Sequence, residues 1–110
     1  MNVGELAKKI NGSLLSGDEN RNLAGCYIGD LLSLCMSRVE ADNIWITIQS
    51  NINIVAVASL TDAGCIVVCD GFEPDSDALN KAKDEEISII STSMSAYEIA
   101  GIVHDFEKGV

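Results

Sequence analysis

The sequence has few basic residues, and this shortage excludes two classes of partner. Its 110 residues include 17 Asp and Glu but only 7 Lys and Arg, which gives a formal net charge of −10. Proteins that bind nucleic acids or anionic membranes use clustered Lys and Arg to neutralise phosphates. The seven basic residues here are scattered along the chain. We therefore expect neither nucleic acid nor membrane among the partners.

Long hydrophobic runs are also missing. No stretch approaches the 18 or more apolar residues that span a membrane, and the first residues lead into an amphipathic segment instead of a signal sequence. We therefore expect a cytoplasmic protein, and disulfides are rare in that compartment. Cys65 and Cys69 would lie roughly 13 Å apart along a strand, too far for one zinc ion or one disulfide. We interpret the four cysteines as small buried apolar residues and predict no metal site.

Catalytic motifs are scarce as well. The sequence contains neither a phosphate-binding loop of Walker A type nor the G-x-G-x-x-G pattern of dinucleotide-binding folds. His104 is the single histidine, and no Cys–His or Ser–His–Asp arrangement is apparent around it. We therefore predict that the protein is not an enzyme, and the sequence implies no cofactor.

A repeated unit is present instead, three times in the second half of the chain. Each unit is a short apolar strand, a polar turn and a segment of helical length, with strands expected at residues 44–48, 65–69 and 87–90. Alternating strands and helices are typical of a mostly parallel sheet with helices packed on it. A chain of 110 residues has no room for two independent cores. The predicted fold is therefore a single α/β domain with a central, mostly parallel sheet.

The first part of the chain is predicted to lead into this core. Apolar residues at positions 3, 6, 7 and 10 have helical spacing, and short extended segments are expected at residues 14–15 and 23–28. Asp30 stands before another helical segment, and aspartate is a favoured N-cap. We therefore expect a helix and an extended lead-in over residues 1–24, then a core over residues 25–107 whose first helix is capped by Asp30.

The segment over residues 52–60 is ambiguous. Its Ile and Val content favours a strand. The two parallel strands on either side of it, however, require a crossover of about a dozen residues, usually a helix. We predict a helix here, and apolar residues on all its sides indicate that it is buried all round.

Two further helices are predicted towards the end of the chain. Pro74 and the acidic residues after it mark the start of a surface helix that continues to about Glu85. The sequence Ser95-x-x-Glu98 is a capping box that begins the last helix. The buried stripe of this last helix is expected to comprise Ala96, Ile99, Ala100, Val103 and Phe106.

Polar residues follow each of the three strands, where parallel sheets usually bind ligands. The candidate ligand-binding residues are Gln49, Ser50, Asn51 and Asn53 after the first strand, Asp70 and Gly71 after the second, and Ser91, Thr92 and Ser93 after the third. Each group also has a structural interpretation. Ser50 or Asn51 could cap the helix that follows, Asp70-Gly71 is a common turn dipeptide, and the serines could cap the last helix.

Several blocks of the sequence resemble one protein family. They include Gly29-Asp30-Leu31-Leu32-Ser33, Asp42-x-x-Trp45-Ile46-Thr47 and Gly64-Cys65-Ile66-Val67-Val68. From about residue 25 to residue 103 the chain resembles the DRTGG domain family, and it looks distantly similar to the N-terminal domains of HPr kinase and of Mur ligases. The resemblance implies a bacterial α/β domain of three layers with a regulatory or binding role.

The chain departs from the family at the residues that give the family its name. Where the family has Asp-Arg, this chain has Ser50-Asn51-Ile52-Asn53, and where it has Thr-Gly-Gly, this chain has Cys69-Asp70-Gly71, so that only Gly71 carries over. Arginine is the residue best suited to bidentate contact with an anionic ligand. Its absence, together with the acidic charge, argues against a nucleotide or acyl phosphate.

These observations lead to two functional hypotheses. The first is a regulatory module that binds a small ligand at the three strand ends. The second is a domain that binds a copy of itself or another protein and takes no ligand. Tyr27, Trp45 and Phe72 are the candidates for anchors of such an interface.

Overall fold

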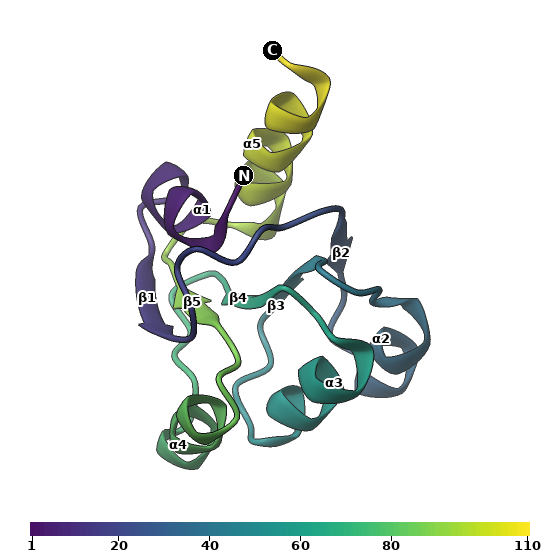
Figure 1. Ribbon diagram of the computed structural model, residues 1–110, viewed down its shortest axis with the longest axis vertical. Helices are drawn as coiled ribbons and strands as arrows, with labels where there is room; N and C mark the ends of the chain where they lie inside the picture. The colour runs from purple at the N-terminus through teal and green to yellow at the C-terminus, as the bar shows by residue number, and fades with distance from the viewer.

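The computed structural model describes all 110 residues as five strands and five helices (Figure 1). The strands are β1 (Ser13–Ser16), β2 (Cys26–Ile28), β3 (Ile44–Thr47), β4 (Cys65–Val68) and β5 (Ile89–Ser91). The helices are α1 (Val3–Lys9), α2 (Leu32–Arg38), α3 (Asn53–Thr61), α4 (Ser76–Asp84) and α5 (Ala96–Lys108). The strands form one sheet in the order β1-β5-β4-β3-β2, in which only β1 is antiparallel to its neighbour. The predicted mostly parallel sheet is confirmed.

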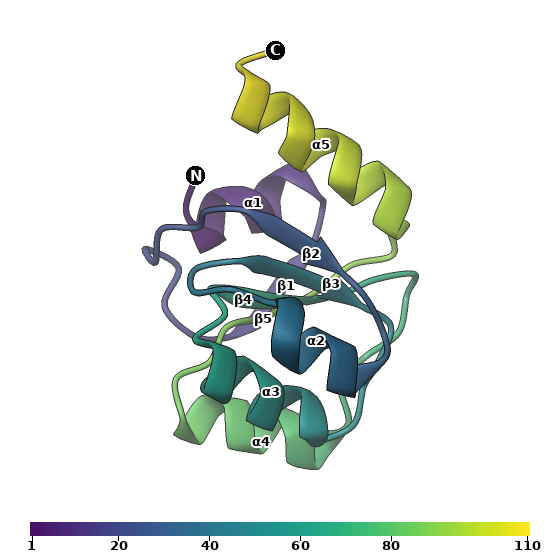
Figure 2. The same ribbon diagram turned by 90° about the vertical axis from the view of Figure 1, so that its right-hand side faces the viewer.

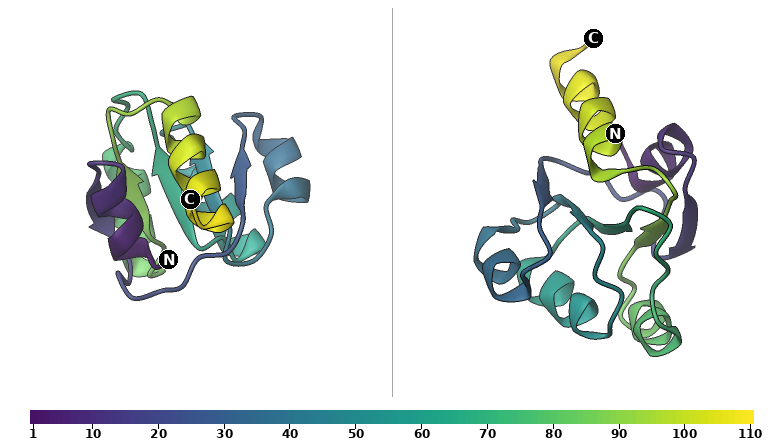
Figure 3. Two further views of the ribbon diagram at one scale, coloured as in Figure 1. Left: turned by 90° about the horizontal axis from the view of Figure 1, so that it is seen from above. Right: turned by 180° about the vertical axis from the view of Figure 1, so that it is seen from behind.

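Helices cover both faces of this sheet and make three layers (Figures 2 and 3). α2, α3 and α4 lie on one face, where they bury Trp45, Ile66 and Ile89 of the central strands. α1 and α5 lie on the other face, over Ile46 and Val67. Strands buried on both faces are apolar throughout instead of alternating, which is why each strand reads as a short hydrophobic run. None of the five helices is both long and apolar enough to cross a membrane.

The ambiguous segment forms a helix, α3, as predicted, but this helix is not buried all round. Ile54, Val55, Val57 and Ala58 face the core. The outer side is open, because α2 and α4 flank α3 without covering it (Figure 2), and the side chain of Leu60 is 74% exposed there.

Asp30 does not cap α2, contrary to the prediction. The helix begins at Leu32, and its N-cap position makes no side-chain hydrogen bond. Asp30 Oδ1 instead accepts hydrogen bonds from Thr47 Oγ1 and from the Ile48 N–H, both at 2.9 Å. The carboxylate therefore satisfies a backbone amide just past the end of β3 and ties the end of β2 to it.

Two aromatic residues also differ from expectation. Trp45 was a candidate interface anchor but lies wholly in the core, where its Nε1 donates to the Gly29 carbonyl at 3.1 Å. Phe106 was expected in the buried stripe of α5 but is exposed, because the end of α5 extends beyond the sheet (Figure 1). Lys9 Nζ lies 5.6 Å from the centre of the Phe106 ring. Phe72, another candidate anchor, is exposed.

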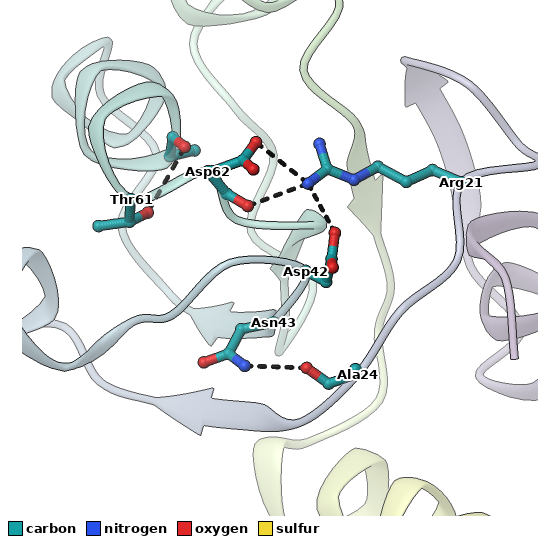
Figure 4. A network of polar contacts seen from close by, with 7 residues as sticks. Arg21, Ala24, Asp42, Asn43, Thr61 and Asp62 are labelled. Carbon is teal, nitrogen blue, oxygen red and sulfur yellow. Dashed lines mark hydrogen bonds and ion pairs between the residues drawn. The ribbon is translucent and has the colours of Figure 1, made fainter.

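An ion-pair cluster fastens the lead-in segment across the amino ends of the strands (Figure 4). Arg21 Nη2 lies 3.0 Å from Asp42 Oδ1, 3.0 Å from the Asp62 carbonyl and 3.2 Å from Asp62 Oδ1. Asp42 and Asp62 belong to the turns that precede β3 and β4. Beside them, Asn43 Nδ2 donates to the Ala24 carbonyl at 2.9 Å. One guanidinium thus joins three segments that are far apart in the sequence.

We predict that Arg21→Ala lowers the stability of the fold without changing it. Loss of these half-exposed contacts should cost about 1 kcal/mol and lower Tm by about 4 °C. Thermal unfolding followed by circular dichroism measures the change. The control is Arg38→Ala, which removes an exposed arginine that forms no ion pair. Equal Tm values for the two variants would contradict the role of Arg21.

Candidate functional site

The three polar loops predicted from the sequence meet at one edge of the sheet. We call this surface the carboxyl edge; it comprises residues 47–53, 69–75 and 91–95. Backbone hydrogen bonds join the loops to one another. The Asp75 N–H donates to the Ser50 carbonyl at 2.8 Å, and the Gly71 N–H donates to the Thr92 carbonyl at 3.0 Å. The candidate residues of β3, β4 and β5 therefore lie on one continuous surface.

The polar side chains after β3 are largely engaged within their own loop. Gln49 Nε2 donates to the Asp30 carbonyl at 2.9 Å, and Asn51 Nδ2 donates to Gln49 Oε1 at 3.1 Å. Asn51 Oδ1 accepts from the Asn53 N–H at 2.9 Å, at the start of α3. The hydroxyl of Ser50 lies 3.3 Å from the Ile48 carbonyl. The N-cap residue of α3 is Ile52, so neither Ser50 nor Asn51 caps the helix as anticipated, although Asn51 accepts a hydrogen bond from its first residue.

The loop after β4 presents an exposed carboxylate. Asp70 and Gly71 both have positive φ angles, 59° and 79°, which make the tight turn. A Cβ atom on Gly71 would meet nothing within 4 Å, so the glycine is required by its conformation and not by crowding. Cys69 Sγ lies 3.6 Å from Asp70 Oδ2, and burial together with this carboxylate raises the pKa of Cys69 to about 11.

The loop after β5 contributes one free hydroxyl of the three predicted. Ser91 and Thr92 are buried, whereas Ser93 is exposed. Thr92 Oγ1 donates to the Ile10 carbonyl at 2.8 Å and accepts from the Met94 N–H at 3.1 Å. Its hydroxyl therefore joins the end of α1 to the end of β5.

One residue of this surface was not among the candidates. Asp30 follows β2 as the other polar residues follow their strands, and its bonds to the end of β3 place it at the same edge. Its position after Ile28-Gly29, at the end of a short strand, could have identified Asp30 as a further candidate residue.

The carboxyl edge is acidic. The residues around the four strand ends, 29–34, 47–54, 69–77 and 91–97, contain no Lys or Arg. They contain five carboxylates, those of Asp30, Asp70, Glu73, Asp75 and Asp77. Coulomb repulsion therefore acts against any anion that approaches this edge.

No hollow of the molecular surface lies between the three loops of the carboxyl edge, although Ile52 and Asn53 at its margin line hollows beside α3. One of about 390 Å³ lies between α1, β1 and residues 19–20, and another of about 480 Å³ is lined by Gly17, Asp18, Lys83 and Glu86. Two more flank α3, with volumes of about 310 and 500 Å³. Of the candidate residues only Asn53 lines a hollow, beside α3. The carboxyl edge is thus an open surface and not a pocket.

The cysteines and the histidine lie apart from one another. All four cysteines are free thiols; Cys35, Cys65 and Cys69 are buried and Cys26 is half-buried. Burial raises the pKa of Cys26 to about 11 and raises the pKa of Cys65 still further. His104 is exposed on α5, with the Asp105 carboxylate 3.9 Å away. No group of three His, Cys, Asp or Glu side chains gathers closely enough to hold a metal ion.

Fold and sequence together identify the class of domain. The molecule is a three-layer α/β domain with a five-stranded, mostly parallel sheet. Residues 5–106 match the DRTGG domain, and the chain belongs to the DRTGG domain family. The resemblance carried by Gly29-Asp30-Leu31-Leu32-Ser33 and the other blocks is therefore confirmed. No curated protein matches the chain.

A solved structure shares the fold. It contains the CBS and DRTGG domains of the regulatory region of Clostridium perfringens pyrophosphatase, complexed with the activator diadenosine tetraphosphate. The TM-score is 0.75 at 11% sequence identity, over 93% of this chain and 45% of that chain. The present chain thus corresponds to less than half the length of its structural neighbour, and at this identity the likeness establishes the fold alone.

We predict that Thr92→Val destabilises the domain although it preserves the size of the side chain. The substitution leaves the buried Ile10 carbonyl and the Met94 N–H without their partner, which should cost about 1–3 kcal/mol. Urea unfolding measures the change in the free energy of unfolding. Ser93→Ala, which removes an exposed hydroxyl one residue away, should change it by less than about 0.5 kcal/mol. If Thr92→Val and the unmodified protein have the same midpoint of urea unfolding, the buried hydroxyl does not have this structural role.

Proposed function

We propose that this chain is a regulatory module without catalytic activity that binds a small ligand at the carboxyl edge. The observation that carries the proposal is the convergence of three hydrogen-bonded loops on one edge, with the Asp70 carboxylate and the Ser93 hydroxyl exposed. Parallel α/β sheets commonly bind ligands at this edge. The regulatory role is supported by the structural neighbour, which belongs to the regulatory region of an enzyme and is complexed with an activator.

The negative charge of the carboxyl edge indicates which class of ligand can bind there. Five carboxylates and no basic side chain surround the strand ends. By the resemblance to the family, Ser50-Asn51-Ile52-Asn53 stands where the family has its arginine, and the exposed amide of Asn53 is present there instead of a guanidinium. We therefore infer that the ligand is neutral or cationic, in contrast to the polyphosphate activator of the structural neighbour. Exposed carboxylate, hydroxyl and amide groups suit an amine or a polyol.

We also propose that the protein has no catalytic activity. Thiolates, not thiols, are the reactive form of cysteine, and burial raises the pKa of these thiols away from that form. Free buried thiols also fit the reducing cytoplasm of a bacterium, where we expect the protein. His104 is exposed on α5, and the side chain paired with it is the exposed carboxylate of Asp105.

A second function, self-association or binding of a protein partner, is favoured by a separate observation. Several large apolar side chains of α2, α3 and the residues before them are exposed: Leu31, Leu34, Met36, Ile52 and Leu60. Exposed apolar groups that lie together usually mark an interaction surface.

A thermal-shift screen tests the ligand proposal. We predict that amines or polyols raise Tm, and that nucleotides, acyl-CoA and sugar phosphates do not. A ligand present at about 100 times its Kd stabilises the folded state by about 2.7 kcal/mol, worth several degrees in a domain of this size. Asp70→Asn should abolish the shift, because it removes the charge while asparagine still tolerates the left-handed backbone at this position.

The control for that screen is Asp105→Asn, which removes an exposed carboxylate from α5, outside the carboxyl edge. It should leave the shift unchanged. A clear shift with a nucleotide polyphosphate would contradict the inferred ligand class. Equal shifts for Asp70→Asn and the unmodified protein would place the ligand somewhere other than the carboxyl edge.

A further inference from the structure

The outer sides of α2 and α3 form an uncharged surface on a strongly acidic molecule. Residues 31–37 and 44–61 contain no Asp, Glu, Lys or Arg, although the chain has a net charge of −10. α3 is the one helix without any charged residue. Exposed apolar side chains project here, among them Leu31, Ile52 and Leu60. We call this surface the α2–α3 face; it comprises the exposed parts of residues 31–37 and 52–60.

The α2–α3 face has the shape of a ridge between two hollows. Ile52, Ala56 and Leu60 follow one another at intervals of four residues and form the exposed ridge of α3. The hollow of about 500 Å³ lies towards α2 and is lined mainly by apolar side chains, including Leu32 and Met36. The hollow of about 310 Å³ lies towards α4, which flanks α3 on the other side (Figure 2).

The rim of this face is electrically balanced. The only charged residues that line either hollow are Lys81 and Glu85 of α4. Lys81 Nζ lies 3.5 Å from Glu85 Oε2, so the pair contributes no net charge. A partner that docks on this face therefore meets apolar and neutral polar groups, with no uncompensated carboxylate to desolvate.

We propose that a second copy of this chain docks on the α2–α3 face and forms a two-fold symmetric dimer with α3 packed against α3. In a two-fold interface the same patch must fit itself. A ridge beside hollows meets this condition, because Leu60 of each copy can enter a hollow beside Ala56 of the other. The small side chain of Ala56 at the middle of the ridge allows the two helices to approach closely.

Charge favours a copy of the chain over a basic partner. A basic protein would be drawn to the surfaces that carry the 17 acidic residues, and those lie outside this face. Two copies of charge −10 repel each other, and the repulsion is smallest when they meet at faces that carry no charge, as the α2–α3 face does. Added salt should therefore strengthen the dimer by screening the repulsion between the two bodies. Association through ion pairs would respond in the opposite way.

The size of the face sets the expected affinity. A standard interface takes about 800 Å² from each partner, and the accessible surface of the whole chain is 5663 Å². Helices of seven and nine residues offer less than that standard area on their own. We therefore expect a dimer that dissociates at micromolar concentrations. This dimer is a specific form of the second candidate function, with the α2–α3 face as the interface and a second copy as the partner. It does not depend on a ligand at the carboxyl edge.

Sedimentation velocity over about 1–200 μM, a range set by the expected micromolar Kd, tests the proposal. The unmodified protein should pass from a monomer of 11.7 kDa to a dimer. Leu60→Asp should raise Kd at least tenfold. Because Leu60 is 74% exposed, the substitution should lower Tm only slightly when both proteins are compared as monomers at the low end of this concentration range. Tyr97→Asp, at an 88% exposed position of α5 on the opposite face of the sheet, is the matched control and should dimerise normally. Asp70→Asn should also dimerise normally, which separates this proposal from the ligand site.

Cross-linking tests whether the α3 helices of the two copies face each other in the dimer. In an Ala56→Cys variant the two new thiols would face each other across the axis, and a short bismaleimide should join the copies. Tyr97→Cys should stay monomeric on a denaturing gel, and the native thiols are buried or half-buried. A chain that remains monomeric over the whole concentration range overturns the proposal. So does a dimer that tolerates Leu60→Asp, or one that Ala56→Cys fails to cross-link.

Discussion

The burial of β3, β4 and β5 on both faces is the constraint on which the rest of the structure depends. Every residue of these strands is buried, and helices must cover both sides to keep them so. With both faces covered, polar groups can reach solvent only at the two ends of the strands and on the outer sides of the helices. Arg21 fastens the lead-in at the amino ends, and the candidate ligand site lies at the carboxyl ends.

Most polar groups at the carboxyl edge serve the fold, and this narrows where a ligand can bind. Asp30, Asn51 and Thr92 satisfy backbone groups that the strands leave unpaired when they end. Their hydrogen bonds hold the loops in a fixed arrangement. Asp70 and Ser93 are exposed on the same loops. A residue held by the fold and a residue free to bind a ligand can thus have the same side-chain chemistry and stand side by side in the sequence.

The sequence was sufficient for the sheet, the three strand ends and the helix at residues 52–60, because these follow from local pattern and from the crossover that parallel strands require. The capping box at Ser95 was also predicted correctly, since both partners lie within one turn. The roles of Asp30 and Arg21 were not predicted, because their hydrogen-bond partners lie 17 to 41 residues away in the sequence. The exposure of Leu60 was missed because apolar residues on every side indicate burial, whereas no neighbouring element covers the outer side of α3. Which residues at the carboxyl edge bind a ligand stays a prediction.

The most direct test of the proposed ligand site is a ¹H–¹⁵N correlation spectrum recorded while a polyol and a short polyamine are titrated separately into the protein. The account predicts that the amide signals that move belong to residues 47–53, 69–75 and 91–95, with the largest shifts around Asp70. Shifts confined to residues 31–37 and 54–60 of the α2–α3 face, or to the hollow beside α1, would contradict the site. A spectrum that neither compound changes, but that a nucleotide polyphosphate does, would contradict the ligand class.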